Sequence, residues 1–240
     1  MKSLAIALAG LFVCVSASTS SAQSKSNPGP SGTWRWELNM NGETINNVLK
    51  LQSEPDGGLL GSLEARDRKM EIKDGKFKDG RVTFQIVAEL RTTVTIDFDG
   101  KLDGDKLAGD IRFSANGETR ETAWDAKRSV ESSDVVGVWE LKIETPDGQK
   151  LTPVLTVTNS GKNLAAKYES NGTVIDAKEV KIKDNHLLFQ IDTDLDGAPL
   201  HVEFKGRPYG TKLAGTLEYS VNGDTGEMDF AGLCKAESKP

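Results

Sequence analysis

Apolar and polar residues alternate strictly along most of the chain after residue 31. In the segment 34–40, Trp34, Trp36, Leu38 and Met40 occupy every second position, with Arg35, Glu37 and Asn39 between them. This period of two is typical of a half-buried β-strand. It recurs at 82–90, 94–98, 107–113, 139–143, 187–191, 202–204 and 213–219. No window of comparable length shows a helical period, so the pattern predicts an all-β fold.

Turn signals separate these runs at the spacing of about 8–12 residues that is typical of β-sandwiches and β-barrels. Asn-Gly or Asp-Gly pairs stand at 41–42, 74–75, 103–104, 116–117, 196–197 and 222–223. Such pairs supply the positive φ angles of tight hairpins. Tight turns between successive strands indicate an up-and-down order, and eight strands of this kind close into a small barrel without exposed edges.

The alternating pattern occurs in two successive copies along the chain. The first copy runs from Gly32-Thr33-Trp34 to Arg128, and the second from Gly137-Val138-Trp139 to Lys235. Trp34 aligns with Trp139 at an offset of 105, and Lys106-Leu107-Ala108-Gly109 aligns with Lys212-Leu213-Ala214-Gly215 at 106. Internal repetition at this scale indicates a tandem of similar units.

We therefore predict two tandem eight-stranded antiparallel up-and-down barrels. The first occupies residues 32–128 and the second 137–235, joined by a polar linker at 129–136. Residues 23–31 are interpreted as a disordered leader and 236–240 as a C-terminal tail.

A Gly-x-Trp on the first strand with an Arg or Lys ending the last of eight strands resembles the calycin superfamily, which includes lipocalins, fatty-acid-binding proteins and avidins. The resemblance implies that the basic side chain packs over the Trp ring and closes the base of each barrel. Carried over, Trp34 would contact Arg128, and Trp139 would contact Lys235. The second lipocalin motif (Thr-Asp-Tyr) is absent, no cysteines pair, each copy is shorter than a typical lipocalin, and no biotin-binding residues can be placed by motif. The resemblance thus implies a fold and no particular function.

Residues 1–22 have the features of a signal peptide. Lys2 precedes an apolar run at 4–15, and small residues at 16–22 suit signal peptidase. The apolar run is shorter than the roughly 20 residues that a membrane span needs. Cys14 invites a lipoprotein interpretation, but Val13 stands where that signal requires a small residue. We expect export to the periplasm or the extracellular space, which leaves Cys234 as the remaining cysteine and no intrachain disulfide.

Charge and hydropathy narrow the range of partners. Removal of Lys2 leaves 29 basic and 36 acidic side chains, a net charge near −7. This balance argues against nucleic acid and anionic membrane surfaces, which require concentrated Lys and Arg. No second apolar stretch is long enough for a membrane span, and we expect a monomer.

One segment matches the spacing of a calcium loop. Asp192, Asp194, Asp196 and Gly197 are followed by Glu203 at the twelfth position. The flanking residues have the pattern of strands, whereas this loop normally joins two helices, so an acidic hairpin turn is favoured. We predict no metal there, and no cofactor.

Candidate catalytic groups are few. His186 and His201 are interpreted as surface residues, and no nucleophile elbow, phosphate loop or dinucleotide motif occurs. The inward-facing positions are apolar except Asn47, which makes a poor active site. The first hypothesis is an exported non-catalytic module that binds a small apolar ligand or a partner surface. The alternative is a structural or accessory domain pair of the cell envelope with solid barrel cores, and an envelope hydrolase ranks third.

Overall fold

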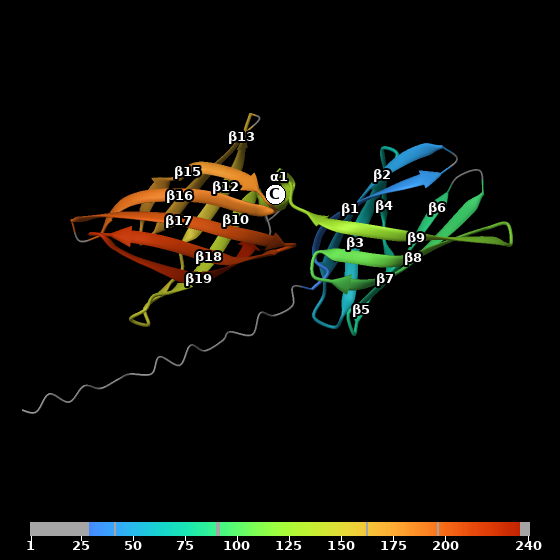
Figure 1. Ribbon diagram of the computed structural model, residues 1–240, viewed down its shortest axis with the longest axis horizontal. Helices are drawn as coiled ribbons and strands as arrows, with labels where there is room; N and C mark the ends of the chain where they lie inside the picture. Colours follow the sequence, from blue (N-terminus) through green and yellow to red (C-terminus); the bar gives the residue numbers. More distant parts are fainter. Residues whose placement is uncertain (1–28, 41, 90–91, 162, 196, 236–240) are drawn as a thin grey trace, which may run out of the picture.

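The described part of the chain consists mostly of antiparallel β-strands, arranged in two bodies that lie one after the other along the long axis of the molecule (Figure 1). The computed structural model describes residues 29–40, 42–89, 92–161, 163–195 and 197–235. The predicted signal peptide, most of the leader and the C-terminal tail lie outside these residues. Within the described ranges, no helix has the length and apolar character to cross a membrane.

The first repeat forms a closed barrel. Its strands are β1 (Gly32–Met40), β2 (Glu43–Ser53), β3 (Gly58–Ala65), β4 (Arg68–Glu71), β5 (Lys73–Lys78), β6 (Arg81–Glu89), β7 (Thr93–Asp103), β8 (Lys106–Ala115) and β9 (Glu118–Ser129). The sheet order is β2-β1-β9-β8-β7-β6-β5-β3-β4, and β2 also pairs with β3. Eight strands therefore close into a ring, and the short β4 is attached to β3 as a ninth. The predicted closed eight-stranded barrel is confirmed for this repeat.

The second repeat has the same strand order, but its described residues do not close into a ring by strand pairing. Its strands are β10 (Gly137–Glu144), β11 (Lys150–Leu151), β12 (Val154–Ser160), β13 (Asn163–Ser170), β14 (Thr173–Asp176), β15 (Lys178–Lys183), β16 (His186–Leu195), β17 (Ala198–Tyr209), β18 (Lys212–Val221) and β19 (Asp224–Lys235). The described residues form a sheet that runs from β14 to β15, with β11 paired to β10. Between β13 and the segment before β15, the amide of Ala177 donates to the carbonyl of Ala166 at 2.9 Å, but no ladder follows.

The closing pair of the first barrel depends on a glycine that the second repeat lacks. In the first barrel Leu59 pairs with Gly75, and a Cβ on Gly75 would lie 2.3 Å from the carbonyl oxygen of Leu59. At the offset of 105, Val180 takes the place of Gly75. A β-branched side chain cannot make so close an approach. A second closed barrel is therefore not confirmed among the described residues.

Each repeat buries its own core on the inward face of its strands, as the alternation predicts. Inside the first barrel, Trp36, Phe84, Phe98 and Trp124 contact one another edge to face or stacked, with ring centroids 4.4–6.2 Å apart. In the second repeat, Phe204 stacks on Phe189 and meets Phe230 edge to face. Aromatic pairs at these distances add to the stability already gained from burial.

The linker contains a short helix that the hydrophobic pattern did not indicate. Helix α1 (Ser132–Val135) lies between the two bodies (Figure 1). Glu131 and Asp134 form a reciprocal capping box at its start, in which each side chain accepts from the backbone of the other. Local polar side chains, rather than an apolar face, account for this turn of helix, and Val135 is buried against the core of the second repeat.

Candidate functional site at the junction of the repeats

Trp34 and Arg128 meet at the base of the first barrel, where it faces the second repeat. The two residues are directly opposite each other on β1 and β9, so their side chains share the inner face. The guanidinium carbon of Arg128 lies 4.2 Å from the centroid of the Trp34 ring. Trp34 is fully buried, and its indole nitrogen donates to the carbonyl of Pro30 at 2.8 Å.

Arg128 is a buried cation with partners around its guanidinium, and only 3% of the residue is exposed. Its Nε donates to Asp105 at 3.1 Å, its Nη2 donates to the carbonyl of Gly29 at 2.9 Å, and its Nη1 donates to the carbonyl of Ser31. Burial lowers the pKa of Arg128 from its ordinary value, and the charge of Asp105 opposes that shift. Partners of this kind are what make a buried charge tolerable.

The structure does not bring Trp139 and Lys235 together in the same way. Cys234 is the residue directly opposite Trp139, whereas Lys235 is opposite Val138 and points to the outer face. Lys235 forms an ion pair with Glu140 at 3.3 Å, and its side chain is 56% exposed. At the offset of 106 that holds for the later strands, Arg128 corresponds to Cys234. The strand register thus places a thiol where the first repeat has a guanidinium.

The second repeat adds its own side chains to the base of the first barrel. Arg128 lies 5.1 Å from the ring centroid of Tyr209, on β17. Arg207, on the same strand, lies 5.7 Å from that ring, and its Nη2 is 2.7 Å from Oδ2 of Asp105. The hydrophobic pattern could not predict this cluster, because it joins residues of different repeats.

The linker is hydrogen-bonded to the outer face of the first barrel. The hydroxyl of Thr33 donates to Asp134 at 2.7 Å, and Nζ of Lys50 donates to the hydroxyl of Ser133 at 3.0 Å. Arg35 forms an ion pair with Glu131. Burial raises the pKa of Asp134, and the hydrogen bond from Thr33 opposes the shift. The second repeat also contacts the first barrel, since the side-chain amide of Asn185 donates to the carbonyl of Arg128 at 3.2 Å.

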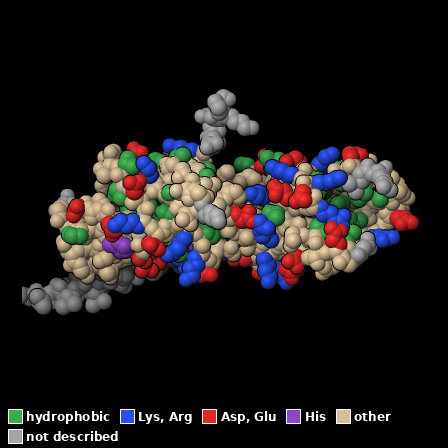
Figure 2. All heavy atoms as spheres, turned by 90° about the horizontal axis from the view of Figure 1, so that it is seen from above, with side chains coloured by type: hydrophobic (Ala, Val, Ile, Leu, Met, Phe, Trp, Pro, Cys, Tyr) green, Lys and Arg blue, Asp and Glu red, His purple; other side chains and the backbone are tan. Residues whose placement is uncertain are grey.

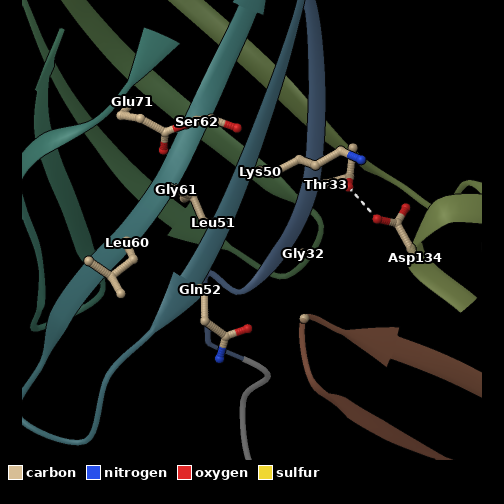
Figure 3. Close-up of a pocket in the computed structure, with 11 residues that line it drawn as sticks. Gly32, Thr33, Lys50, Leu51, Gln52, Leu60, Gly61, Ser62, Glu71 and Asp134 are labelled. Atoms are coloured by element: carbon tan, nitrogen blue, oxygen red, sulfur yellow. Dashed lines mark hydrogen bonds between the residues drawn. The ribbon is translucent and has the colours of Figure 1, made fainter. Parts of the chain in front are cut away.

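A groove of about 320 Å³ lies on the outer face of β1, β2 and β3, next to the linker (Figure 3). Leu60 projects from β3 with 57% of its surface exposed. Around it stand Lys50 and Gln52 from β2, Glu71 from β4, Asp134 from α1 and Gly210 of the second repeat. The groove thus combines an exposed apolar side chain with an amine, an amide and carboxylates. The sequence signal for it was Leu60 itself, an apolar residue at an outward position.

The segment with calcium-loop spacing forms part of a strand hairpin. Strands β16 and β17 pair through Leu195 and Ala198, Asp194 is opposite Pro199, and Glu203 is opposite Gln190. Asp192 accepts a hydrogen bond from Lys178 at 2.8 Å and pairs with Nδ1 of His201 at 2.6 Å. Asp196 lies outside the described residues. That no metal binds here remains a prediction.

The two histidines lie at the surface. His201 pairs with Asp192 and lies 3.4 Å from Glu203, which raises the pKa of His201, chiefly through the Asp192 hydrogen bond. His186 contacts the carbonyl of Asp184 at 2.7 Å. Within the described ranges, no group of three or more His, Cys, Asp or Glu side chains is arranged to hold a metal ion.

One face of the molecule shows how its charged side chains are distributed. On the face shown in Figure 2, Lys and Arg lie intermingled with Asp and Glu over both repeats. Nucleic-acid binding requires a concentrated basic surface, and this face offers none.

Comparisons with known proteins yielded only distant structural similarity. No family model matches the chain, and no curated protein matches it. A crystal structure titled "putative outer membrane protein" from Bacteroides fragilis NCTC 9343 superimposes with a TM-score of 0.29 at 11% identity, covering 85% of this chain and 97% of the other. The structure of a protein of unknown function from the DUF3598 family of Nostoc punctiforme PCC 73102 gives a TM-score of 0.26 at 10% identity, and the match covers 86% of this chain and 96% of the other. The structure of kievitone hydratase from Nectria haematococca gives a TM-score of 0.22 at 9% identity, and the match covers 88% of this chain and 92% of the other.

Proposed function

We propose that the protein is an exported, non-catalytic binding module whose binding surface is the groove around Leu60. The observation that carries this proposal is the exposure of Leu60, at 57%, beside Lys50 and Glu71 in a groove made by the first repeat, the linker and the second repeat. Large exposed apolar patches rimmed by polar residues mark interaction sites, whereas Leu60 is a single exposed side chain, so the proposal depends on its position in a groove with polar groups around it.

The partner that fits this groove best is an extended polypeptide segment. An apolar side chain of the partner packs against Leu60, while Lys50 and Glu71 pair with charges of opposite sign on either side of it. A pattern of one apolar anchor between charges gives specificity as well as contact area. Because Thr33 and Asp134 hold the linker against the barrel, the groove is largely formed before the partner arrives, which reduces the entropic cost of binding.

The barrel interior is a weaker candidate for a ligand. Trp36, Phe84, Phe98 and Trp124 pack across the centre of the first barrel, as expected of a solid core. One observation keeps a small ligand as the second candidate: the indole nitrogen of Trp36 is buried and has no hydrogen-bond partner in the part of the chain that the structure describes. An apolar molecule with one acceptor oxygen would satisfy that nitrogen.

Photo-cross-linking tests the groove directly. We expect a photoreactive amino acid at position 60, in protein expressed in its own host, to give one discrete cross-linked species that unlabelled wild-type protein competes away. Leu60→Asp protein should not compete. The matched control is position 174, because Val174 is a similarly exposed apolar strand residue, at 55%, outside the groove. Equal cross-linking at both positions, or competition by Leu60→Asp protein, would contradict the proposal.

Native mass spectrometry of the same purified protein distinguishes the second candidate. A retained small molecule, lost in Trp36→Phe protein, would place a ligand in the barrel. A clean mass together with no specific cross-link would favour a structural domain pair with solid cores.

We also propose that the second repeat is a calycin-like barrel with one seam left unpaired, and that export removes residues 1–22. N-terminal sequencing of the protein from its host checks the second statement, since a mature chain that starts at Met1 would contradict it.

A further inference from the structure

Two arginines from different repeats share a single carboxylate at the junction. Nε of Arg128 lies 3.1 Å from Oδ1 of Asp105, and Nη2 of Arg207 lies 2.7 Å from Oδ2. Among the described residues, no other carboxylate forms an ion pair with either arginine. The three groups therefore carry one positive charge in excess, in a place from which much of the water is excluded.

The two guanidiniums differ in how well they are satisfied. Nitrogens of Arg128 donate to Asp105 and to two backbone carbonyls. For Arg207, in contrast, the buried Nε has no hydrogen-bond partner among the described residues, and the buried Nη2 meets Asp105 as an ion pair outside hydrogen-bond geometry. Only 14% of the Arg207 side chain is exposed. Buried donors without acceptors are costly and rare in folded proteins.

We propose that Arg207, with Arg128 beside it, is the binding site of a small oxyanion, a phosphate or carboxylate group. The planar fork of an arginine, formed by Nε and one Nη, matches two oxygens of such a group. The excess positive charge favours an anion at this point, and Tyr209 holds the Arg207 guanidinium from one side.

Asp105 determines how the anion enters. It lies in the turn between β7 and β8, and its side chain is 49% exposed. Its carboxylate already occupies part of the space before Arg207, so an incoming anion displaces it toward water. The site is therefore weak in the wild type and becomes stronger when Asp105 loses its charge.

Thermal unfolding in phosphate, compared with chloride at equal ionic strength, tests the site. At a phosphate concentration about ten times the dissociation constant, we expect the wild-type melting temperature to rise by about 3–6 °C. Phosphate also stabilises proteins by exclusion from their surfaces, so the decisive quantity is the part of the rise that Arg207→Gln removes. Arg81→Gln is the matched control, because Arg81 also pairs with one aspartate but is 67% exposed on the outside of the barrel.

Asp105→Asn provides a second measurement that does not depend on the folding of the Arg207 variant. We expect its phosphate-induced rise to exceed that of the wild type, since the competing carboxylate is removed. Acetate in place of phosphate distinguishes a general oxyanion site from one that prefers a tetrahedral anion. Equal rises in wild-type and Arg207→Gln protein, or no gain in Asp105→Asn protein, would overturn the proposal, and neither result bears on the groove around Leu60.

Discussion

Arg128 joins three parts of the molecule through one side chain. Its guanidinium covers the Trp34 ring, pairs with Asp105 and donates to carbonyls of the segment before β1. The Tyr209 ring of the second repeat lies on the same group. Removing such a residue leaves several groups without a partner at once, so its effect is larger than that of an ordinary surface cation.

We predict that Arg128→Ala lowers the free energy of unfolding of the first repeat by about 2–4 kcal/mol, because it leaves buried carbonyls unpaired and exposes the Trp34 ring. Urea unfolding monitored by tryptophan fluorescence measures the change. Lys235→Ala, at the position that the repeat pattern first equated with Arg128, should change stability by less than about 0.5 kcal/mol, as is usual for an exposed residue. Similar costs for the two variants would show that the Trp34 contact contributes little.

His201 gives the protein a weak dependence on pH. Its pKa is raised above 6.5, so its pairing with Asp192 and Glu203 stabilises the folded state below that pH and is lost as the pH rises through the folded-state value. Both partners are exposed to solvent, so the effect on stability is at most a few tenths of a kcal/mol, about the value of a surface pair. NMR titration of the His201 ring should give a pKa above 6.5, and Asp192→Asn should lower it. An unchanged His201 pKa in that variant would show that Asp192 is not the cause.

Among the strands, the pairing of β3 with β5 is one of the links that close the first barrel. In the first barrel, Leu59 of β3 is opposite Gly75 of β5. Beside this pair, the amide of Phe77 donates to the carbonyl of Gly57 at 2.8 Å. In the second repeat the same place holds Leu164 and Val180, and no ladder forms between β13 and β15 in the part of the chain that the structure describes. At this pairing the first barrel has no room for a Cβ at position 75.

We predict that Gly75→Val opens this seam. The new side chain would displace Leu59, because a Cβ at position 75 would lie 2.3 Å from the Leu59 carbonyl oxygen, and overpacking of this kind costs about 1–3 kcal/mol. Hydrogen exchange should show faster exchange of the Phe77 amide, while amides of the β7–β8 hairpin keep their protection. Val180→Gly is the reverse change in the second repeat and should leave the Phe77 amide unaffected. Full protection of Phe77 in Gly75→Val protein would contradict this account of the seam.

In the molecule as a whole, the two repeats are held together by the linker and by side chains from both sides. Asp134 of the linker accepts a hydrogen bond from Thr33 of the first repeat. Asn185 of the second repeat donates to the carbonyl of Arg128, and the side-chain amide of Gln52 lies 3.4 Å from the hydroxyl of Thr211 in the second repeat. These contacts couple the repeats, and independent domains would unfold in separate transitions.

We predict that Asp134→Ala uncouples the repeats. The variant loses the capping box and leaves the buried hydroxyl of Thr33 without its acceptor, which costs about 1–3 kcal/mol. Calorimetry should show a broader or divided unfolding transition, and limited proteolysis should cut within 129–136. Ser133→Ala removes only an exposed hydrogen bond to Lys50 and should unfold like the wild type. A single sharp transition in Asp134→Ala protein would show that other contacts suffice.

The all-β class, the tandem repeat and the inward-facing residues follow from the amino-acid sequence alone. These features depend on interactions between near neighbours along the chain. Alternation decides which side of a strand faces the core, and Asn-Gly or Asp-Gly pairs decide where the chain reverses. The resemblance to calycins also pointed to Trp34 with Arg128, a pair on neighbouring strands that the structure brings into contact.

Features that depend on contacts between distant segments emerge only in the folded chain. The pairing of β3 with β5 needs the close approach of Gly75 to Leu59 on the neighbouring strand. The pairing of Trp139 with Cys234 instead of Lys235 depends on strand register. The junction, where Arg207 and Asp105 come from different repeats, has no periodic signal at all. A linear pattern records which face of a strand is buried, but it does not record which side chains meet when two such faces or two repeats are packed together.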